Sequence, residues 1–464
     1  MIQAFKNIWA IADLRYRVLF TFAMLGVYRI GGHIPTPGID SQALLRFFQS
    51  QQGSILGFVD LFSGGNFSRL TIFALGIMPY ITASIILQLL TVVIPALERL
   101  AKEGEAGRKK ITQYTRYGTV LLSVIQSYFI SLWLQSTNAS GMGQIVLDPG
   151  LGFQLMTVIT LTTGTAFIMW LGEQISERGI GNGISLIIYA GIVVGLPNAV
   201  ANTWVDLTTG QINLIVVLLL LAIMAAVVAA IVLVERAQRK IPIQYARRVV
   251  GRRVYGGAST YLPLRVNTAG VIPVIFASSV LAIPQTIAPI GVLKDVTWVQ
   301  NLLRQLEYSA PIYNLLYFLL IVFFCFFYVS IIFNPMDQAD NMKKYGGFIP
   351  GIRPGKKTAE YIDRILSRLT FGGAVYLGLV SILPVFLISG IRVQTLPWGI
   401  GPALEGILPS FFTDGLGVKF FFGGTSLLIV VGVAMDTVQQ IESQLIMRHY
   451  EGFMKGTRIR GRRG

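Results

Sequence analysis

Ten apolar stretches, eight of them without a charged side chain, dominate this sequence. A helix needs about 20 mostly apolar residues to cross a bilayer. We therefore predict an all-α polytopic membrane protein with ten transmembrane helices, the fifth beginning slightly before its short apolar stretch. Arg29 lies near one end of the first stretch, and Asp436 near the far end of the tenth. The expected spans are residues 18–34, 72–94, 117–134, 151–171, 184–196, 212–234, 268–292, 311–333, 370–391 and 420–438.

Composition supports this class. Of the 464 residues, 53% are hydrophobic and only 13% are charged, about half the charged share of a soluble protein. So few charges cannot coat the two to four soluble domains that such a length would form. The net charge is nevertheless +16.

The basic residues are distributed unevenly between the two sides of the membrane. With ten spans both termini lie on one side, and that side receives 31 of the 38 Lys and Arg residues, leaving 7 for the other. Because basic residues collect on the cytoplasmic side, we predict cytoplasmic termini. A missed span would scramble this asymmetry.

Two of the predicted cytoplasmic loops are longer than a connection requires. Residues 240–265 alternate apolar and polar side chains around Gly251, which predicts a hairpin-like arm. Residues 334–368 predict a short helix, an ordered Gly/Pro tip at 345–355, and a second helix. Thr358 is expected to cap that second helix, with Glu360 in its first turn.

Residues 57–71 are partly apolar, too short to span a bilayer, and interrupted by Gly64 and Gly65. Irregular backbone survives at membrane depth only if it is buried in protein or faces a cavity. The pattern alone favours a surface loop or an interfacial turn.

The sequence lacks the usual signs of catalysis or ion coupling. Cys325 is the single cysteine, and His33 and His449 lie far apart, so no group has metal-ligand spacing. There is no phosphate-binding loop and no nucleophile motif. Transporters that couple to ions place ionisable groups in mid-membrane. We therefore expect no enzyme activity, no metal and no cofactor, and an apolar or weakly polar interior.

Two sets of residues in the spans are candidates for function. Thr82, Gln88 and Asn182 are weakly polar and would ordinarily make hydrogen bonds between helices. Ile77 and Ile81 share one face of the second span, and Ile184 and Ile188 share one face of the fifth. Most isoleucines in a membrane protein face lipid or packed core.

Short motifs in order along nearly the whole chain resemble the SecY family, the channel subunits of bacterial Sec protein translocases. Each motif is weak alone, and together they are specific. They are IPTPGID (34–40), LFSGG (61–65), FALGIMPY (73–80), KEGE (102–105), QYTRYG (113–118), GIGNG (179–183), AGVIP (269–273), GIRPG (351–355) and GGTSLLI (423–429).

The resemblance implies two pseudo-symmetric five-helix halves around a central pore, residues 1–197 and 198–464, hinged after the fifth span. It implies a lateral gate between spans two and three and spans seven and eight, with a polar cluster of Thr82, Gln88 and Asn182. The implied hydrophobic pore ring is Ile77, Ile81, Ile184, Ile188, Ile275 and Ile429. The implied plug, which seals the channel from outside, is Asp60, Leu61, Phe62, Ser63, Gly64, Gly65, Asn66, Phe67, Ser68, Arg69, Leu70 and Thr71.

The resemblance also implies partners. The loops 236–265 and 334–368, with the basic tail 446–464, would face the cytoplasm of a bacterium, and Arg252, Arg253 and Arg353 would dock the SecA motor or the ribosome. SecE and SecG subunits, signal peptides, nascent chains and membrane lipids are the other implied partners. The external loop 390–419 is longer and richer in Pro and Gly than the family pattern suggests.

Two other functions stay open at this stage. A secondary transporter for a small solute would show uptake by the purified protein alone, and the absence of mid-span charge disfavours it. A membrane scaffold that binds ribosomes would not contact a translocating chain.

Overall fold

The computed structural model describes residues 11–50, 60, 63–138, 144–210, 212–245, 248–250, 253–255, 259–287, 305–306, 310–390 and 424–456. The chain divides into two compact units. Unit 1 comprises Met1–Asn202, Ala282–Leu303 and Val433–Gly464, and unit 2 comprises Thr203–Leu281 and Arg304–Gly432. The predicted external loop 390–419 lies outside the described residues, apart from Gly390.

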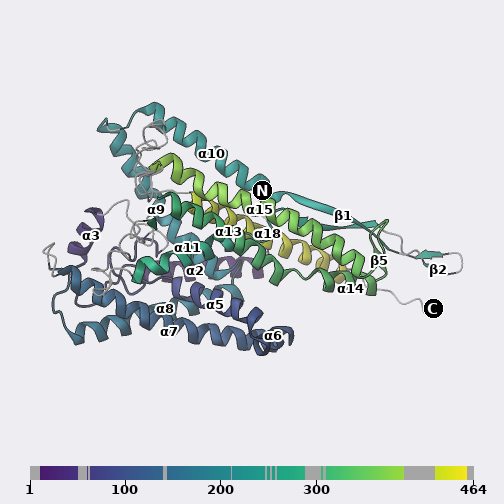
Figure 1. The fold of residues 1–464 in the computed structure, drawn as a ribbon, viewed down its shortest axis with the longest axis horizontal. Coiled ribbons are helices and arrows are strands. Elements are labelled where there is room, and N and C mark those ends of the chain that lie inside the picture. Colours follow the sequence, from purple (N-terminus) through teal and green to yellow (C-terminus); the bar gives the residue numbers. More distant parts are fainter. Residues whose placement is uncertain are drawn as a thin grey trace. The chain divides into compact units, whose positions relative to one another are not determined.

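A helix lies over each of the ten expected spans (Figure 1). Within the described residues, six helices are long and apolar enough to cross a membrane, or seven if a bent pair counts as one span. The helices are α2 (Ala12–Gly31), α5 (Met78–Val93), α7 (Glu105–Asn138), α8 (Leu151–Arg178), α9 (Gly183–Thr208), α10 (Leu214–Arg236), α11 (Ile272–Ile287), α13 (Pro311–Ile332), α15 (Lys356–Ser389) and α18 (Gly424–Gly456).

Three expected boundaries are wrong. Helix α9 continues through Pro197 to Thr208 instead of ending at residue 196, because a proline can kink a helix without ending it. Helix α7 begins at Glu105, three turns before its apolar stretch. The second helix of loop 334–368 and the ninth span form one continuous helix, α15.

The bent pair joins α5 to the short helix α6 (Pro95–Lys102) at an angle of 100°. Pro95 is the first residue of α6 and Ile94 has extended backbone. A residue before proline is pushed out of the helical region, so the chain turns sharply where the apolar span ends. An ion pair between Lys102 and Glu98, 2.6 Å apart, lies on the exposed surface of α6.

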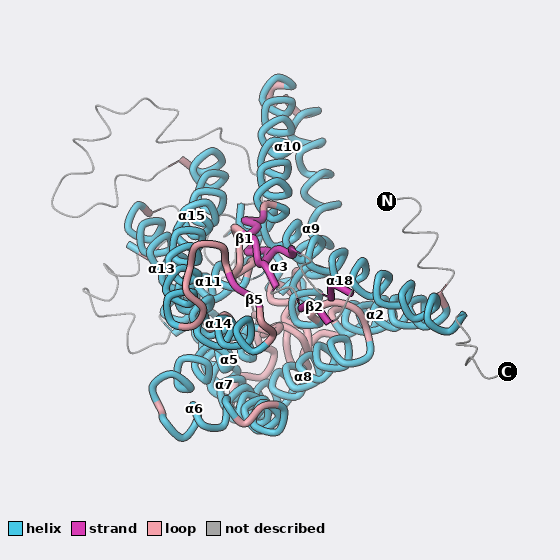
Figure 2. Tube along the Cα trace, turned by 90° about the vertical axis from the view of Figure 1, so that its right-hand side faces the viewer, coloured by secondary structure: helices cyan, strands magenta, loops and turns pink. Residues whose placement is uncertain are grey.

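Unit 1 is packed around α7, which contacts α5 and α8 (Figure 2). The buried face of α7 is a stripe of small hydroxyl side chains at four-residue spacing. Each hydroxyl donates to a carbonyl one turn back in α7, so none is buried without an acceptor. Small residues let membrane helices approach closely. The stripe is Thr115, Thr119, Ser123, Ser127 and Ser131.

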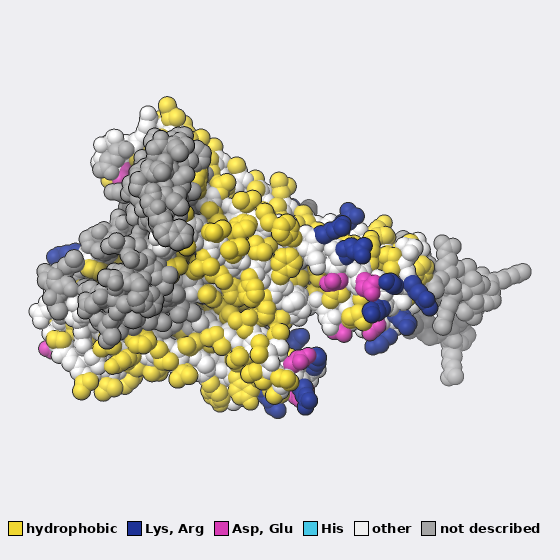
Figure 3. Space-filling view, viewed as in Figure 1, with side chains coloured by type: hydrophobic (Ala, Val, Ile, Leu, Met, Phe, Trp, Pro, Cys, Tyr) yellow, Lys and Arg dark blue, Asp and Glu magenta, His cyan; other side chains and the backbone are white. Residues whose placement is uncertain are grey.

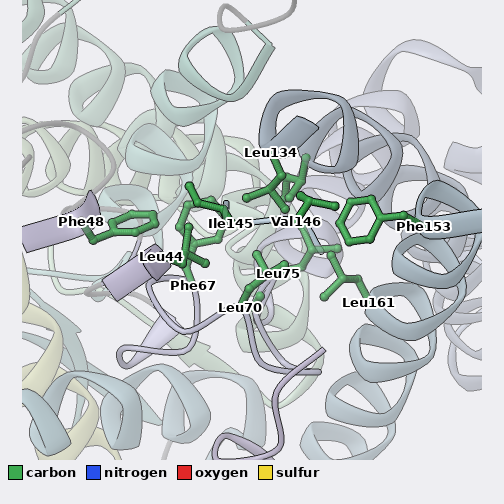
Figure 4. Packing of buried hydrophobic residues seen from close by; sticks show 12 residues of the cluster. Leu44, Phe48, Phe67, Leu70, Leu75, Leu134, Ile145, Val146, Phe153 and Leu161 are labelled. Carbon is green, nitrogen blue, oxygen red and sulfur yellow. The ribbon is translucent and has the colours of Figure 1, made fainter. Parts of the chain in front are cut away.

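A second core in unit 1 joins α3 (Ser41–Ser50) to segments far away in the sequence (Figure 4). Leu44 from α3, Leu134 from α7 and Leu161 from α8 are all fully buried there. Phe67 and Leu70, from the glycine-interrupted segment, pack among them. This core therefore holds that segment against three helices.

Unit 2 carries the predicted arm. Strands β1 (Gln238–Tyr245) and β4 (Ser259–Arg265) pair antiparallel, and β2 (Arg248–Val250) pairs with β3 (Arg253–Tyr255) further out. Ile241 and Ile243 of β1 are buried, and the hairpin-like arm that the alternating pattern predicted is confirmed. The short helix of the second loop is also confirmed, as α14 (Pro335–Lys344).

The expected cap of α15 is wrong. The residue before the helix is Gly355, and Thr358 is its third helical residue. The hydroxyl of Thr358 donates to the carbonyl of Arg353 at 3.0 Å, so it fastens the tip rather than capping the helix. Glu360 lies beyond the first turn and pairs with Lys357 at 3.0 Å.

A close approach in unit 1 gives a stability prediction. A Cβ atom at Gly164 of α8 would overlap the carbonyl oxygen of Ile72, whereas one at Gly152 on the same helix would meet nothing within 4 Å. Gly164→Ala should lower the free energy of unfolding by about 2 kcal/mol or more, because backbone must move. Gly152→Ala should be neutral or slightly stabilising. Thermal unfolding in detergent checks this, and equal melting temperatures would contradict the packing described.

Candidate functional site

Residues 63–77 form an irregular segment that is mostly buried within unit 1. Its turns lead from Ser63 to the start of α5, and Asn66, Leu70 and Thr71 are each only 1% exposed. The sequence pattern favoured a surface loop or interfacial turn, and burial shows that a surface loop is wrong. The alternative, irregular backbone buried in protein, describes what is found. We call residues 60 and 63–71 the seated segment.

Backbone hydrogen bonds fasten the C-terminal end of the seated segment to the chain that follows α2. The amide of Thr36 donates to the carbonyl of Leu70 at 2.9 Å, and the amide of Ile72 donates to the carbonyl of Ile34 at 3.0 Å. Pro35 and Thr71 form an antiparallel bridge. Thr36, Leu70 and Thr71 are each 1% exposed, so these bonds pair peptide groups of a mostly buried stretch.

Side chains of α2 fasten the other end. The hydroxyl of Tyr28 donates to the carbonyl of Ser63 at 3.1 Å, and Nη1 of Arg29 donates to the carbonyl of Gly64 at 3.2 Å. Asn66 donates from Nδ2 to the same Ser63 carbonyl at 2.6 Å and to the Tyr28 hydroxyl at 3.2 Å. Two consecutive residues of α2 thus hold two consecutive carbonyls.

Asp60 organises the segment internally. Its Oδ1 accepts from the amide of Ser68 at 2.8 Å and from the hydroxyl of Ser63 at 3.3 Å. Its backbone carbonyl accepts from the amide of Gly65 at 2.9 Å. Burial raises the pKa of the Asp60 carboxyl, and the hydrogen bonds from Ser68 and Ser63 partly offset that rise.

Glycine contacts bring the segment close to neighbouring helices. A Cβ atom at Gly64 would lie 2.7 Å from the Cα of Gly191 in α9, so the two backbones touch. A Cβ atom at Gly32 would lie 2.5 Å from Oδ1 of Asn66. Gly64 and Gly65 both have positive φ, of 72° and 79°, a conformation that favours glycine.

Aromatic rings enclose Phe67 on the far side of the segment. Its ring stacks on Trp133 of α7, with centroids 6.3 Å apart, and meets the edge of Phe48 at 5.5 Å. Phe73 is stacked between Tyr28 of α2 and Phe167 of α8. Such pairs add about 0.5–1.5 kcal/mol each beyond burial, so the segment is held by packing as well as by hydrogen bonds.

Among the described residues, the three weakly polar candidates make their hydrogen bonds within one helix or at its cap. Thr82 donates to the carbonyl of Met78, and Gln88 donates to the hydroxyl of Ser84, both within α5. Oδ1 of Asn182 accepts from the amides of Ile184 at 3.1 Å and Ser185 at 3.4 Å. Asn182 is therefore the N-cap of α9, and none of the three hydrogen-bonds to another helix within the described part of the chain. The lateral-gate role of the three remains a prediction.

Five of the six predicted ring isoleucines are buried, with Ile184 half-buried. Ile77 and Ile81 lie one turn apart at the start of α5, and Ile184 and Ile188 lie one turn apart on α9. Ile275 in α11 and Ile429 in α18 belong to unit 2, where Val271 and Gly432, one turn away from each, are in contact. Burial argues against lipid-facing positions for these five, and their pore-lining role remains a prediction.

The predicted docking arginines differ in how far the structure describes them. Arg252 lies outside the described residues, and of Arg253 only the backbone, in β3, is described. Arg353 is exposed at the Gly/Pro tip. Lys and Arg side chains gather over α14 and the adjoining loops, whereas hydrophobic side chains cover much of the helical surface (Figure 3). No group of side chains suited to a metal occurs among the described residues.

Sequence reasoning missed Tyr28 and Arg29 as residues that hold the segment. A signal existed for Arg29, because an ionisable residue in an apolar span marks a functional site by default. Tyr28 carried no such signal. Its role depends on a partner 35 residues away in the sequence.

Long apolar helices and an irregular segment buried beside them define a multi-pass α-helical membrane protein. The SecY family model matches residues 71–438. The Escherichia coli K12 protein translocase subunit SecY is 48% identical over 97% of this chain and 96% of its own length. That of Streptomyces galbus is 48% identical over 98% of this chain and its whole length. The chain belongs to the SecY family.

Solved structures share the fold. A protein-conducting channel matches with a TM-score of 0.61 at 18% identity, over 92% of both chains. A second solved structure matches with a TM-score of 0.60 at 21% identity, over 92% of both chains. Its description says that the plug domain of the SecY protein stabilises the closed state of the translocation channel and maintains a membrane seal. Sec61 from a canine ribosome-channel complex matches with 0.56 at 17% identity, again over 92% of both.

The cap at Asn182 gives a prediction. Asn182→Ala should lower the free energy of unfolding by about 1 kcal/mol, because two amides of α9 lose their acceptor. Asn182→Ser should keep most of the free energy of unfolding that the cap contributes, because a serine hydroxyl can accept the same hydrogen bonds. Denaturant or thermal unfolding of the three purified proteins decides this. Equal stability of the alanine and wild-type proteins would refute the capping role.

Proposed function

We propose that this chain is the central protein-conducting channel of a Sec translocon. It would pass unfolded secretory proteins across the membrane and release transmembrane segments sideways into lipid. The observation that carries the proposal is the seated segment, an irregular stretch held by hydrogen bonds and close contacts among membrane helices. Membership of the SecY family supports the same conclusion.

The physical requirement for such a channel agrees with these residues. Each bare peptide group costs several kcal/mol in lipid, so an unfolded chain needs a wet path that closes when idle. A ring of branched aliphatic side chains closes around a chain without binding it and dewets when empty. We assign that ring to Ile77, Ile81, Ile184, Ile188, Ile275 and Ile429, and the plug to residues 60–71.

The architecture we propose is ten transmembrane helices in two halves, residues 1–197 and 198–464. The helix over each expected span supports the count. The lateral gate would separate spans two and three from seven and eight. A sufficiently apolar cargo segment leaves through it because burying Leu, Ile, Phe or Val in lipid is favourable.

We assign the protein to a bacterial plasma membrane with both termini in the cytoplasm, as its one-sided charge supports. It would work with SecE and SecG, without catalysis of its own and without a cofactor. SecA or the ribosome would drive it from the cytoplasmic loops. Ribosomal RNA is a polyanion, so contacts with Arg252, Arg253 and Arg353 should weaken as salt rises.

Cross-linking to a stalled secretory chain tests the channel directly. A photoreactive side chain at Ile81, which is 4% exposed, should capture the stalled chain, whereas one at Ile86, 43% exposed on the same helix, should capture lipid. If the stalled chain is cross-linked at neither position, the channel is refuted and a scaffold is favoured. Solute uptake by the protein alone would instead favour a transporter.

The seal makes a separate prediction. Gly64→Ala and Gly65→Ala both place a side chain at positive φ, at a backbone cost of about 1–2 kcal/mol. Only the Cβ atom at residue 64 would collide with Gly191. Gly64→Ala should therefore raise the resting ion conductance of planar bilayers, while Gly65→Ala stays close to wild type. Equal conductance of the two variants would count against the seal.

The docking role of Arg353 is tested by comparing a substitution that reverses its charge with one that keeps it. Arg353→Glu should leave membrane insertion intact and abolish export, because the exposed tip would repel a polyanionic partner. Arg353→Lys keeps the charge and should retain part of the activity, less any contribution from the guanidinium fork. Export assays with both proteins at equal abundance check this. Normal export by the glutamate variant would refute docking at this residue.

A further inference from the structure

The two cytoplasmic loops of unit 2, which the sequence presents as separate, share one hydrophobic core. Ile241 from β1 and Leu264 from β4 pack with Ile349 from the tip and Ile362 from α15, all four 3% exposed or less. Leu262, Met342, Ile352 and Tyr361 pack around them. A core of this kind makes one folded body from both loops.

The two loops also share a sheet. The short strand β5 (Gly347–Phe348) pairs with β1, giving the strand order β4-β1-β5. Gln244 faces Phe348, and Tyr245 faces Gly347, across the antiparallel pair. A Cβ atom at Gly347 would lie 3.1 Å from the ring of Tyr245 and 3.2 Å from Ile243. The tip that carries Arg353 is therefore paired directly with the arm.

A second set of contacts connects this body to α11. Nδ2 of Asn267 donates to Oε1 of Glu235, at the end of α10, at 2.6 Å, and to the carbonyl of Gly270, just before α11, at 3.2 Å. Asn267 and Glu235 are 4% and 6% exposed. The amide of Val266 donates to the carbonyl of Ala237 at 3.0 Å, so the pairing of the arm continues to its base.

Helix α15 makes the third connection. It carries Ile362 of the shared core at one end and runs on through its apolar stretch. Further along, a Cβ atom at Gly373 would lie 2.8 Å from the carbonyl oxygen of Val266. The base of the arm is thus in contact with α15 one residue before Asn267.

We propose that the arm and the Gly/Pro tip form a single lever, and that Asn267 is the positioning residue that joins this lever to α11. A partner that displaces the tip then moves the start of α11, one turn before Ile275, without the loops separating. The inference rests on the proposed channel function. It adds a route by which a displacement of the Gly/Pro tip by a docked partner is transmitted to α11, the helix that carries Ile275 of the predicted pore ring.

A cross-strand disulfide tests whether the loops move together. Gln244→Cys and Phe348→Cys, in a Cys325→Ser background, place two thiols at directly opposed positions, where a disulfide fits. If the loops form one lever, the oxidised protein should export at the rate of its reduced form. Loss of export on oxidation, with recovery on reduction, would overturn the proposal.

Two substitutions test the joint. Gly373→Ala should push the arm base away from α15, whereas Gly372→Ala, whose Cβ atom would meet nothing within 4 Å, is its matched control. Gly373→Ala and Asn267→Ala should each lower the export rate about threefold or more, within the range of coupling energies measured for such networks. Ribosome binding to the same proteins should be unchanged, because the tip is intact.

Glu235→Gln keeps an acceptor for Asn267 and should retain export, while Glu235→Leu should lose it at unchanged ribosome affinity. If ribosome binding and export fall together in Asn267→Ala and Gly373→Ala, the role of Asn267 is only structural and the proposal fails. If the wild-type protein itself exports nothing in the same vesicles, the proposed channel function fails instead. Export at the wild-type rate by Asn267→Ala and Gly373→Ala would refute the connection between the lever and α11, and would leave the proposed channel function intact.

Discussion

The structure depends on one constraint, that backbone polar groups buried among membrane helices must find partners within the protein. Helices satisfy it internally, but residues 63–77 are not a regular helix and must find donors and acceptors elsewhere. Tyr28 and Arg29 of α2, the carbonyl of Ile34 and the carboxyl of Asp60 supply them. Each bond contributes about 1 kcal/mol net.

The two units differ in the interactions that their notable features use. Unit 1 holds the seated segment with glycine contacts and aromatic stacking, which are short-range and salt-insensitive. Unit 2 presents basic side chains on the arm and tip, which act over a Debye length and attract a polyanion. The net charge of +16 comes from residues outside the apolar spans of both units, and the spans contribute almost none of it.

The sequence predicted what depends on local pattern. Apolar runs located a helix at every expected span, and alternation located the hairpin-like arm that contains β1 and β4. It could not predict the pairing of β5 with β1 or the burial of Asn66, because both depend on contacts between residues far apart in the chain. The boundary at residue 196 failed because Pro197 bends a helix as readily as it ends one. The motifs pointed to residues 60–71 through resemblance, whereas pattern alone placed them at the surface.

Thiol accessibility in the seated segment tests the central proposal, that this segment is the plug of the channel; we propose that it leaves its seat when a chain passes. Ser68 is 7% exposed and its neighbour Arg69 is exposed, so Ser68→Cys and Arg69→Cys form a matched pair. With a membrane-impermeant maleimide on the external side, the cysteine at 68 should be protected at rest and react once a secretory chain is stalled in transit. The cysteine at 69 should react in both states. Equal labelling at position 68 with and without the stalled chain would contradict the account.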